Sequence, residues 1–197
     1  MSKEYSQLLD SLLNGEALSE RQAYDLMYKL ADGDLPPPLA GALLAGLRAK
    51  GETADEIRGF ATAMRELAVH PKIPDGAPTI DTVGTGGDGS GTLNLSTGTG
   101  LLAAAAGMRV VKHGNRSISS KSGSADMLEC LGMPLPLDEQ QAVACLDATN
   151  FTFLFAPAYH PAMKAVVPIR TALAIRTVFN VLGPLTNPAA PPFQLIG

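Results

Sequence analysis

The sequence predicts an α/β protein, in which a small amino-terminal helical bundle precedes a domain built on a mostly parallel sheet. Three observations predict this class. Residues 1–70 place apolar side chains at helical spacing and contain no strand pattern. A proline-rich connector follows at residues 71–78. Beyond it, residues 79–197 alternate short β-type runs with helical segments, which is the pattern of parallel strands joined by crossover helices.

The helical domain contains four predicted helices. The leucines at 8–13 lie one turn apart in the first of them. Ser19 with Gln22, and Thr53 with Glu56, have the spacing of capping boxes that begin the second and fourth helices. The prolines at 36–38 open the third helix, where the missing N–H costs nothing. We therefore expect a small bundle whose apolar stripes face inward.

The second domain, residues 79–197, is predicted to hold a mostly parallel sheet, and its last run, 193–197, looks like a strand with no successor in this sequence, so that the sheet looks incomplete at its carboxyl end. Ligands bind at the carboxyl ends of parallel strands, so the loops that follow the strands are the candidate sites. The segment 161–188 is predicted to be mostly helical and to pack toward the helical domain. The sequence pattern predicts strands at 79–83, 109–111, 151–155 and 193–197, and helices at 96–106, 127–131, 138–146 and 161–180.

A glycine-rich loop at residues 84–91 follows the first strand. Its glycines allow the backbone to approach a ligand closely and to present several N–H groups beside the start of a helix, which favours an anion. It matches neither a dinucleotide-binding fingerprint nor a P-loop, and a flexible hairpin is the alternative. Asn94, Ser96 and Thr97 strengthen the phosphate interpretation, although Ser96 alone could simply cap the helix.

A second polar loop, residues 112–124, follows the second strand. It contains three cations, Lys112, Arg116 and Lys121, among several serines. Arg116 can bind an oxyanion through two N–H groups, whereas the lysines act as point charges. A single lysine here could be a solvated surface charge, but the density of donors favours an anion site. His113 by itself is more typical of a structural hydrogen-bond donor than of a catalyst.

Composition narrows the class of function. The 15 Lys and Arg residues against 19 Asp and Glu give a net charge of −4, which argues against a nucleic-acid partner. No apolar run approaches the length of a membrane span, and the first residues carry no apolar signal region. Cys130 and Cys145 form no metal or redox motif and are expected to be buried thiols in a reducing compartment. We therefore expect a cytoplasmic protein that binds a small molecule.

Four motifs, in order along the chain, resemble the signatures of the anthranilate phosphoribosyltransferase family. They are Asp81-Thr-Val-Gly-Thr-Gly-Gly-Asp88, Thr92-Leu-Asn-Leu-Ser-Thr97, Lys112-His-Gly-Asn-Arg116, and Arg170 together with Arg176-Thr-Val-Phe-Asn-Val-Leu-Gly-Pro-Leu-Thr-Asn-Pro188. The resemblance implies transfer of a phosphoribosyl group from 5-phosphoribosyl 1-pyrophosphate to anthranilate in tryptophan biosynthesis. It also implies Mg²⁺ as cofactor and a homodimer joined through the helical domain.

The resemblance further implies roles for individual residues. Ser96 resembles a hydroxyl ligand of magnesium, and the anthranilate contacts fall on Gly84, Asn115 and Arg170, with His113 nearby. No side chain is implied as an acid, base or nucleophile, because an aromatic amine is already neutral near pH 7. The implied donor-binding residues are Gly84, Gly87, Asp88, Thr92, Asn94, Leu95, Ser96, Thr97, Lys112, His113, Gly114, Asn115, Arg116, Ser117, Ile118, Ser119, Ser120 and Ser124.

The chain departs from the family pattern in two residues and in length. Ala174 stands where the family has glycine, which suggests a backbone position with positive φ, and Leu93 stands where it has phenylalanine. The family's Asp-Glu pair for a second magnesium would lie beyond Gly197, so residues 1–197 alone are expected to be nearly inactive. The alternatives are a pyrimidine nucleoside phosphorylase and a noncatalytic truncated paralogue.

Overall fold

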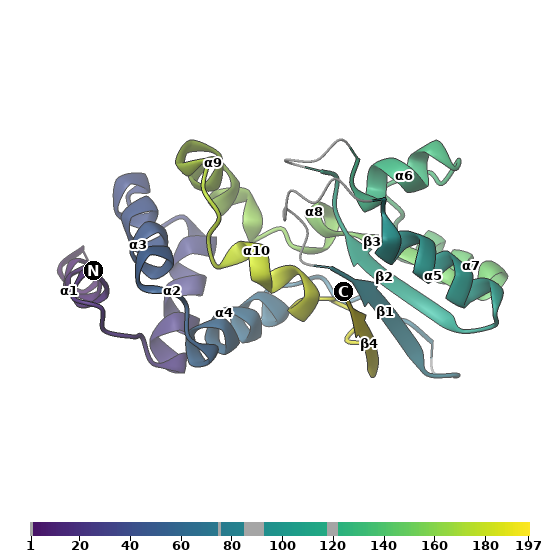
Figure 1. Ribbon diagram of the computed structural model, residues 1–197, viewed down its shortest axis with the longest axis horizontal. Coiled ribbons are helices and arrows are strands. Elements are labelled where there is room, and N and C mark those ends of the chain that lie inside the picture. The colour runs from purple at the N-terminus through teal and green to yellow at the C-terminus, as the bar shows by residue number, and fades with distance from the viewer. Residues whose placement is uncertain (1, 75, 85–92, 118–121) are drawn as a thin grey trace. The chain divides into compact units, whose positions relative to one another are not determined.

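The computed structural model describes residues 2–74, 76–84, 93–117 and 122–197, which form two compact units (Figure 1). The helical unit comprises residues up to Ala68 together with Pro161–Leu182. The sheet unit comprises Val69–His160 and Gly183–Gly197. The chain thus leaves the helical unit, forms most of the sheet unit, returns for one helical segment and ends in the sheet unit. Part of the segment 161–188, which the sequence analysis expects to be helical and to pack toward the helical domain, is grouped with the amino-terminal helices in this division.

The helical unit begins and ends its helices where the sequence predicts. Ser19 and Thr53 each accept a hydrogen bond from a backbone N–H three residues on, and both capping boxes are complete. Gly33 closes the second helix in the left-handed conformation with φ 71°. The helices are α1 (Ser2–Leu13), α2 (Glu20–Asp32), α3 (Pro37–Lys50), α4 (Ala54–Glu66), α9 (Met163–Leu173) and α10 (Phe179–Leu182).

A buried carboxylate ties three parts of the helical unit together. Glu56 is fully buried, and its Oε1 accepts the backbone N–H of Leu18 at 2.8 Å. Its Oε2 accepts Lys50 Nζ at 2.9 Å and the Thr53 N–H at 2.7 Å. Burial alone would raise the pKa of Glu56, but these hydrogen bonds outweigh it and lower the pKa. The leucine-rich core around Leu26, Leu43 and Phe60 packs beside this group.

In the part of the sheet unit that the structure describes there are four strands, all parallel, in the order β3-β2-β1-β4. The final strand, expected as the last element, pairs with β1 at one edge of the sheet. The strands are β1 (Thr79–Val83), β2 (Arg109–Gly114), β3 (Phe151–Phe155) and β4 (Phe193–Ile196). The helices are α5 (Leu95–Ala105), α6 (Ser124–Cys130), α7 (Glu139–Thr149) and α8 (Ala156–Tyr159), and a 3-10 turn spans Gly183–Leu185.

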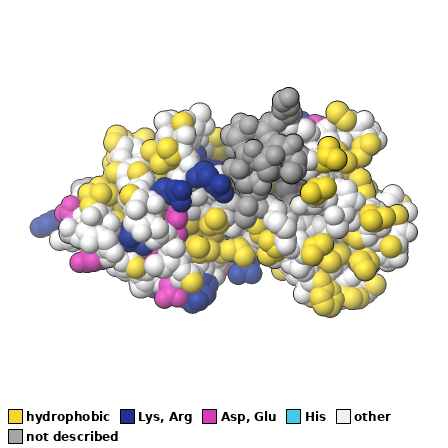
Figure 2. Space-filling model, in the orientation of Figure 1, with side chains coloured by type: hydrophobic (Ala, Val, Ile, Leu, Met, Phe, Trp, Pro, Cys, Tyr) yellow, Lys and Arg dark blue, Asp and Glu magenta, His cyan; other side chains and the backbone are white. Residues whose placement is uncertain are grey.

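The sheet unit buries apolar side chains on both faces of its central strands. Val110 and Phe153 lie in one cluster, and Val111 and Leu154 lie in the other, as expected for parallel strands covered by helices. Figure 2 shows that apolar side chains also reach the surface of this unit, in the region where Figure 1 places α5 and α7. Large exposed apolar side chains of this unit include Leu95, Leu102, Met108 and Leu131.

Several sequence expectations are wrong in detail. The helix expected over 161–180 is interrupted, because Ala174 ends α9 in the left-handed conformation and α10 begins only at Phe179. Strand β2 continues to Gly114 because its last residues pair with β3 as far as Phe155, so the second loop begins at Asn115 rather than Lys112. Helix α5 begins at Leu95, one residue before the expected start. Cys130 is exposed because it lies at the end of α6, and Cys145 is only half-buried because it packs at the border of the apolar cluster around Leu146 of α7.

The C-cap of helix α9 is residue 174, where this chain has alanine and the family pattern has glycine. Ala174 closes this helix with φ 52° and ψ 26°, a left-handed conformation that glycine adopts at lower cost. The expectation of a positive φ at this position is confirmed. Within the described part of the chain, no helix is long and apolar enough to cross a membrane.

Candidate functional site

The two polar loops leave the sheet at the same edge. Strands β1 and β2 are parallel neighbours, so their carboxyl ends, Val83 and Gly114, lie beside each other. The loop after β1 leads to α5, and the loop after β2 leads to α6. The sequence therefore brings a glycine-rich loop and a cationic, serine-rich loop to one end of the sheet.

The described ends of the first loop approach closely. A Cβ added to Gly84 would lie 3.4 Å from Ser96 Oγ, so the start of α5 faces the end of β1. Thr82 Oγ1 donates to the Ser96 carbonyl at 2.8 Å, which fixes this approach. Ser96 lies in the first turn of α5 and is not its cap, so the capping alternative is wrong for it. Thr97 is buried, and Leu93 and Leu95 are exposed. Gly87, Asp88 and Thr92 lie outside the described residues.

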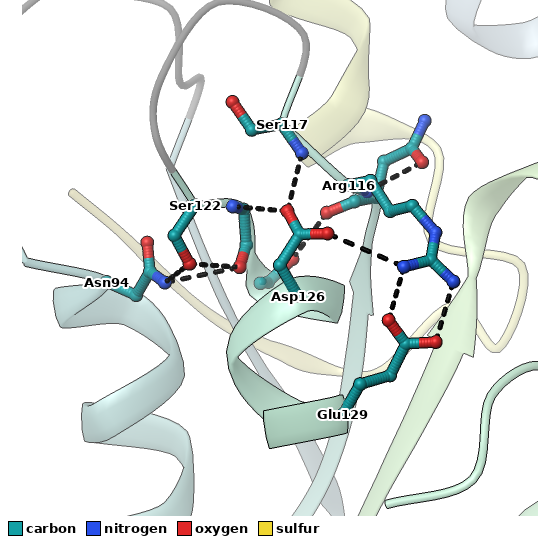
Figure 3. A network of polar contacts seen from close by, with 9 residues as sticks. Asn94, Arg116, Ser117, Ser122, Asp126 and Glu129 are labelled. Atoms are coloured by element: carbon teal, nitrogen blue, oxygen red, sulfur yellow. Dashed lines mark hydrogen bonds and ion pairs between the residues drawn. The ribbon is translucent and has the colours of Figure 1, made fainter. Parts of the chain in front are cut away.

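Asn94 links the two loops. It precedes α5 but makes no capping hydrogen bond with its side chain. Instead its Nδ2 donates to Ser122 Oγ at 3.1 Å and to the Gly123 carbonyl at 3.2 Å (Figure 3). The amide that sequence analysis placed at the helix start thus joins the first loop to the end of the second.

Lys112 lies inside the unit rather than on a loop. It is a residue of β2, its exposure is 2%, and its ammonium donates to the Thr82 carbonyl of β1. The buried Asp81 accepts the His113 N–H at 3.4 Å. Burial lowers the pKa of Lys112, although the charge of Asp81 opposes it. Burial raises the pKa of Asp81, although Asn187 and the charge of Lys112 oppose it. Asp81 and Lys112 therefore lie in the two strands that lead into the glycine-rich loop and the cationic loop.

His113 is buried in β2 and packs edge-on against His160, with 5.1 Å between ring centroids. Burial, and to a smaller extent the charge of His160, lowers the pKa of His113 to about 3. A hydrogen bond with the Gly183 backbone acts in the opposite direction but does not outweigh them. Among the described residues, no hydrogen-bond partner reaches His113 Nε2. The imidazole is therefore uncharged at neutral pH, which agrees with a structural rather than a proton-transfer role.

The base of the second loop is closed by α6 (Figure 3). Asp126 Oδ2 accepts the N–H groups of Ser117 at 3.1 Å and Gly123 at 2.7 Å. Arg116 forms a two-pronged ion pair with Glu129, one arm of which is Nη2 to Oε1 at 2.6 Å. A Cβ on Gly114 would lie 3.0 Å from the buried Phe153 ring and would clash with Ser124 Oγ, so a larger residue there would require the Ser124 side chain to move. Asn115 accepts the Ser124 hydroxyl through its carbonyl at 3.1 Å. Ile118, Ser119 and Ser120 lie outside the described residues.

Arg170, the implied anthranilate contact, belongs to the helical unit, whereas Gly84, His113 and Asn115 belong to the sheet unit. Its guanidinium lies over the Phe179 ring, 5.3 Å from the centroid, and burial lowers its pKa. No carboxylate in the described part of the chain forms an ion pair with it. Arg170 is therefore not held in an ion pair by any of the described residues.

The structure adds polar residues that sequence analysis did not select. Asp126 and Glu129 of α6 bind Ser117 and Arg116 of the second loop. Asp81 and His160 both contact His113 of β2. Asp126 had a usable signal, because it stands three residues after Gly123 in the position of a capping carboxylate. No sequence signal indicated the electrostatic interaction between Asp81 and Lys112, since it depends on the pairing of β1 with β2.

The side-chain donors of the described residues determine how they could hold magnesium. They contain no group of three His, Cys, Asp or Glu side chains able to hold a metal ion. The Ser96 hydroxyl, facing Gly84, is a hard oxygen donor of the kind that magnesium accepts. Magnesium commonly takes one or two protein oxygens and completes its shell with substrate phosphates and water. This donor set fits a metal that is carried mainly by a phosphorylated ligand.

Family profiles match both units. The profile of the glycosyl transferase family helical bundle domain matches residues 6–68, and that of the family's a/b domain matches residues 76–197. The chain belongs to this glycosyl transferase family. Neither profile matches residues 69–75, and this gap overlaps the proline-rich connector at 71–78.

Individual relatives are similar across most of the chain. The anthranilate phosphoribosyltransferase of Burkholderia thailandensis is 54% identical over 172 residues, which are 87% of this chain and 50% of the relative. That of Synechocystis is 49% identical over 197 residues, 100% of this chain and 57% of the relative. The chain therefore spans about half the length of the curated relatives that it matches.

Solved structures agree with the fold. Anthranilate phosphoribosyltransferase from Thermus thermophilus has a TM-score of 0.87 at 46% identity, over 96% of this chain and 57% of that chain. The Saccharomyces cerevisiae enzyme in complex with PRPP and Mg has a TM-score of 0.85 at 28% identity, over 100% of this chain and 59% of that chain. The expected combination of a helical bundle and a parallel-sheet domain is confirmed.

Proposed function

We propose that the protein transfers the phosphoribosyl group of 5-phosphoribosyl 1-pyrophosphate to the amine of anthranilate, giving N-(5-phosphoribosyl)anthranilate and pyrophosphate. The observation that carries this proposal is the 49% identity to the Synechocystis anthranilate phosphoribosyltransferase over all 197 residues, both loops included. The juxtaposition of the two loop bases at one sheet edge supports it independently, because this edge is where parallel sheets bind ligands.

The donor is proposed to bind between the two loops. The residues involved are those that the family resemblance implies in the segments 84–97 and 112–124, either by direct contact with the donor or by fixing the loops that contact it. Backbone N–H groups suit the phosphates, since loop amides beside a helix start form an anion-binding concavity. Asn94 supports this arrangement, because it already connects the two loops through Ser122 and Gly123. The yeast relative in complex with PRPP and Mg offers the corresponding precedent.

Magnesium is proposed to accompany the donor, with the Ser96 hydroxyl as one protein ligand. When bound, the metal would neutralise charge on the pyrophosphate leaving group. Lys112 holds the end of β1 in place through the Thr82 carbonyl, and thereby supports the loop that faces this charge.

Anthranilate is proposed to be held by Arg170, Asn115 and Gly84, with His113 nearby. Arg170 suits a carboxylate because its fork can donate two parallel N–H bonds and no described carboxylate occupies it. A relative from Saccharomyces cerevisiae in complex with 4-fluoroanthranilate, 26% identical with a TM-score of 0.80, supports an aromatic acceptor in this family.

The reaction needs positioning more than proton transfer. The bond between ribose C1 and the pyrophosphate oxygen breaks, a bond from C1 to the anthranilate nitrogen forms, and that nitrogen releases its proton to solvent. The neutral amine requires no base to become a nucleophile, and the uncharged His113 is consistent with this. The residues therefore act by orientation and by stabilising charge, and no covalent intermediate is assigned.

The remaining assignments belong to the same proposal. We expect a cytoplasmic homodimer joined through the helical domain, with no nucleic-acid or membrane partner. The net charge of −4 supports the absence of a nucleic-acid partner.

The test is an assay of anthranilate fluorescence with the donor and magnesium, on protein expressed from its complete reading frame. The proposal expects loss of fluorescence that requires both additions. A parallel assay with thymidine and inorganic phosphate tests the phosphorylase alternative. Phosphorolysis without consumption of anthranilate would overturn the proposal, and inactivity in both assays would favour a noncatalytic paralogue.

A further inference from the structure

The second loop is closed across its base by side chains of α6. Asp126 receives the Ser117 and Gly123 N–H groups on one carboxylate oxygen, so a single side chain joins the two ends of the loop. The ends also abut directly, because a Cβ added to Gly123 would clash with the Ser117 nitrogen and lie 2.9 Å from the Asn115 carbonyl oxygen. Only glycine permits this approach.

Arg116 takes part in the same closure. Figure 3 shows its side chain running to Glu129 on α6, where both terminal nitrogens are engaged. Its Nη1 also lies 3.5 Å from Asp126 Oδ1, and its guanidinium lies 5.6 Å from the centre of the Phe155 ring. The carboxylates and the ring thus hold the guanidinium from three directions.

These contacts leave two possible roles for Arg116. It could swing away from Glu129 to bind a phosphate of the donor, in which case Glu129 competes with the donor. Alternatively it stays on α6 and fixes the loop whose amides meet the donor. The second role agrees better with the structure, because leaving would break a two-pronged ion pair, a second carboxylate contact and an aromatic contact together.

We propose that Asp126 and Glu129 are positioning residues of the donor site, and that Arg116 acts through them rather than as a direct phosphate ligand. This inference rests on the proposed function, because it concerns how the loop presents its N–H groups to 5-phosphoribosyl 1-pyrophosphate. Loss of the clamp would let the loop ends separate and would misplace those groups.

The experiment compares Glu129→Gln and Arg116→Gln, singly and together, with the wild type. The clamp predicts that each single variant raises the KM for the donor about tenfold, since a charge-assisted hydrogen bond is lost. The KM for anthranilate should stay within about twofold, and the double variant should be no worse than either single one, because both remove the same interaction. Donor binding by calorimetry with magnesium should follow the donor KM.

The matched control is Asp147→Asn. Asp147 pairs with Arg109 at 3.0 Å at the amino-terminal end of β2, so this variant removes a comparable ion pair away from the loops. Its KM values should equal those of the wild type. Tighter donor binding in Glu129→Gln would establish competition and overturn the clamp. So would additive losses in the double variant, or no change in either single variant.

Amide hydrogen exchange separates this inference from the proposed function. In Asp126→Ala the Ser117 and Gly123 amides should exchange at least about tenfold faster, since each loses its acceptor. This measurement needs neither donor nor turnover. A wild type that fails to bind the donor would therefore refute the proposed function, while unchanged exchange at both amides would refute the clamp.

Discussion

Acidification should destabilise the protein through His113. The pKa of this imidazole is lowered from 6.5 to about 3, chiefly by burial and then by the charge of His160. Between these two values the unfolded chain binds a proton that the folded chain does not. The free energy of unfolding should therefore fall by about 1.4 kcal/mol for each pH unit below 6.5, and His113 ceases to add to the loss near pH 3. At pH 5 the loss due to this residue is about 2 kcal/mol.

The assay is urea denaturation of the wild type and His113→Asn at several pH values between 7 and 5. The asparagine amide does not titrate, so the variant should be less stable at pH 7 yet lose about 2 kcal/mol less than the wild type on going to pH 5. His113→Gln is a second uncharged replacement and should give the same slope. The carboxylates common to all three proteins cancel in the comparison. Parallel curves for wild type and variants would refute the reasoning.

Three further predictions follow from single residues. Ala174→Gly should raise the free energy of unfolding by about 1 kcal/mol, because it relieves a left-handed alanine at the end of α9, and unchanged urea midpoints would contradict this. Glu56→Gln should lower stability by about 2 to 3 kcal/mol in the same measurement, since it leaves the buried Lys50 ammonium without its charged partner. Arg170→Gln should raise the KM for anthranilate about tenfold or more with little change in the donor KM, and equal damage to both would indicate a folding role.

Helix starts could be predicted from the sequence because their signals lie within a few residues of one another. The capping boxes at Ser19 and Thr53 depend on residues three apart, and both formed as predicted. The end of β2 depends instead on pairing with Phe155 across the sheet, which no local pattern contains. The same limit explains Cys130, whose exposure depends on which side of α6 faces the sheet.

The site was predicted at the level of loops rather than of side-chain roles. Glycine and serine density after a buried strand located both loops, because such composition marks backbone that approaches a ligand. What each cation does was not predictable. The sequence predicts Lys112 as a loop donor, but it lies in the continuously buried part of β2, and its ammonium donates to the Thr82 carbonyl. Arg116 reads as a phosphate ligand, but its partners are supplied by α6, a helix later in the chain.

The placement of these two cations changes how the anion site should be understood. The Lys112 ammonium donates a hydrogen bond to a carbonyl of β1, and the Arg116 guanidinium forms ion pairs with carboxylates of α6. Both charged groups are therefore already engaged within the protein. Each instead fixes one loop, the first from beneath and the second from its base. Among the described residues, the attraction for a pyrophosphate would then come from backbone N–H groups and the start of α5, together with the magnesium that we propose to accompany the donor; Lys121, the third cation of the second loop, lies outside these residues. Donors held in this way are oriented before the ligand arrives, which is the arrangement that stabilises developing charge on a leaving group at least cost in reorganisation.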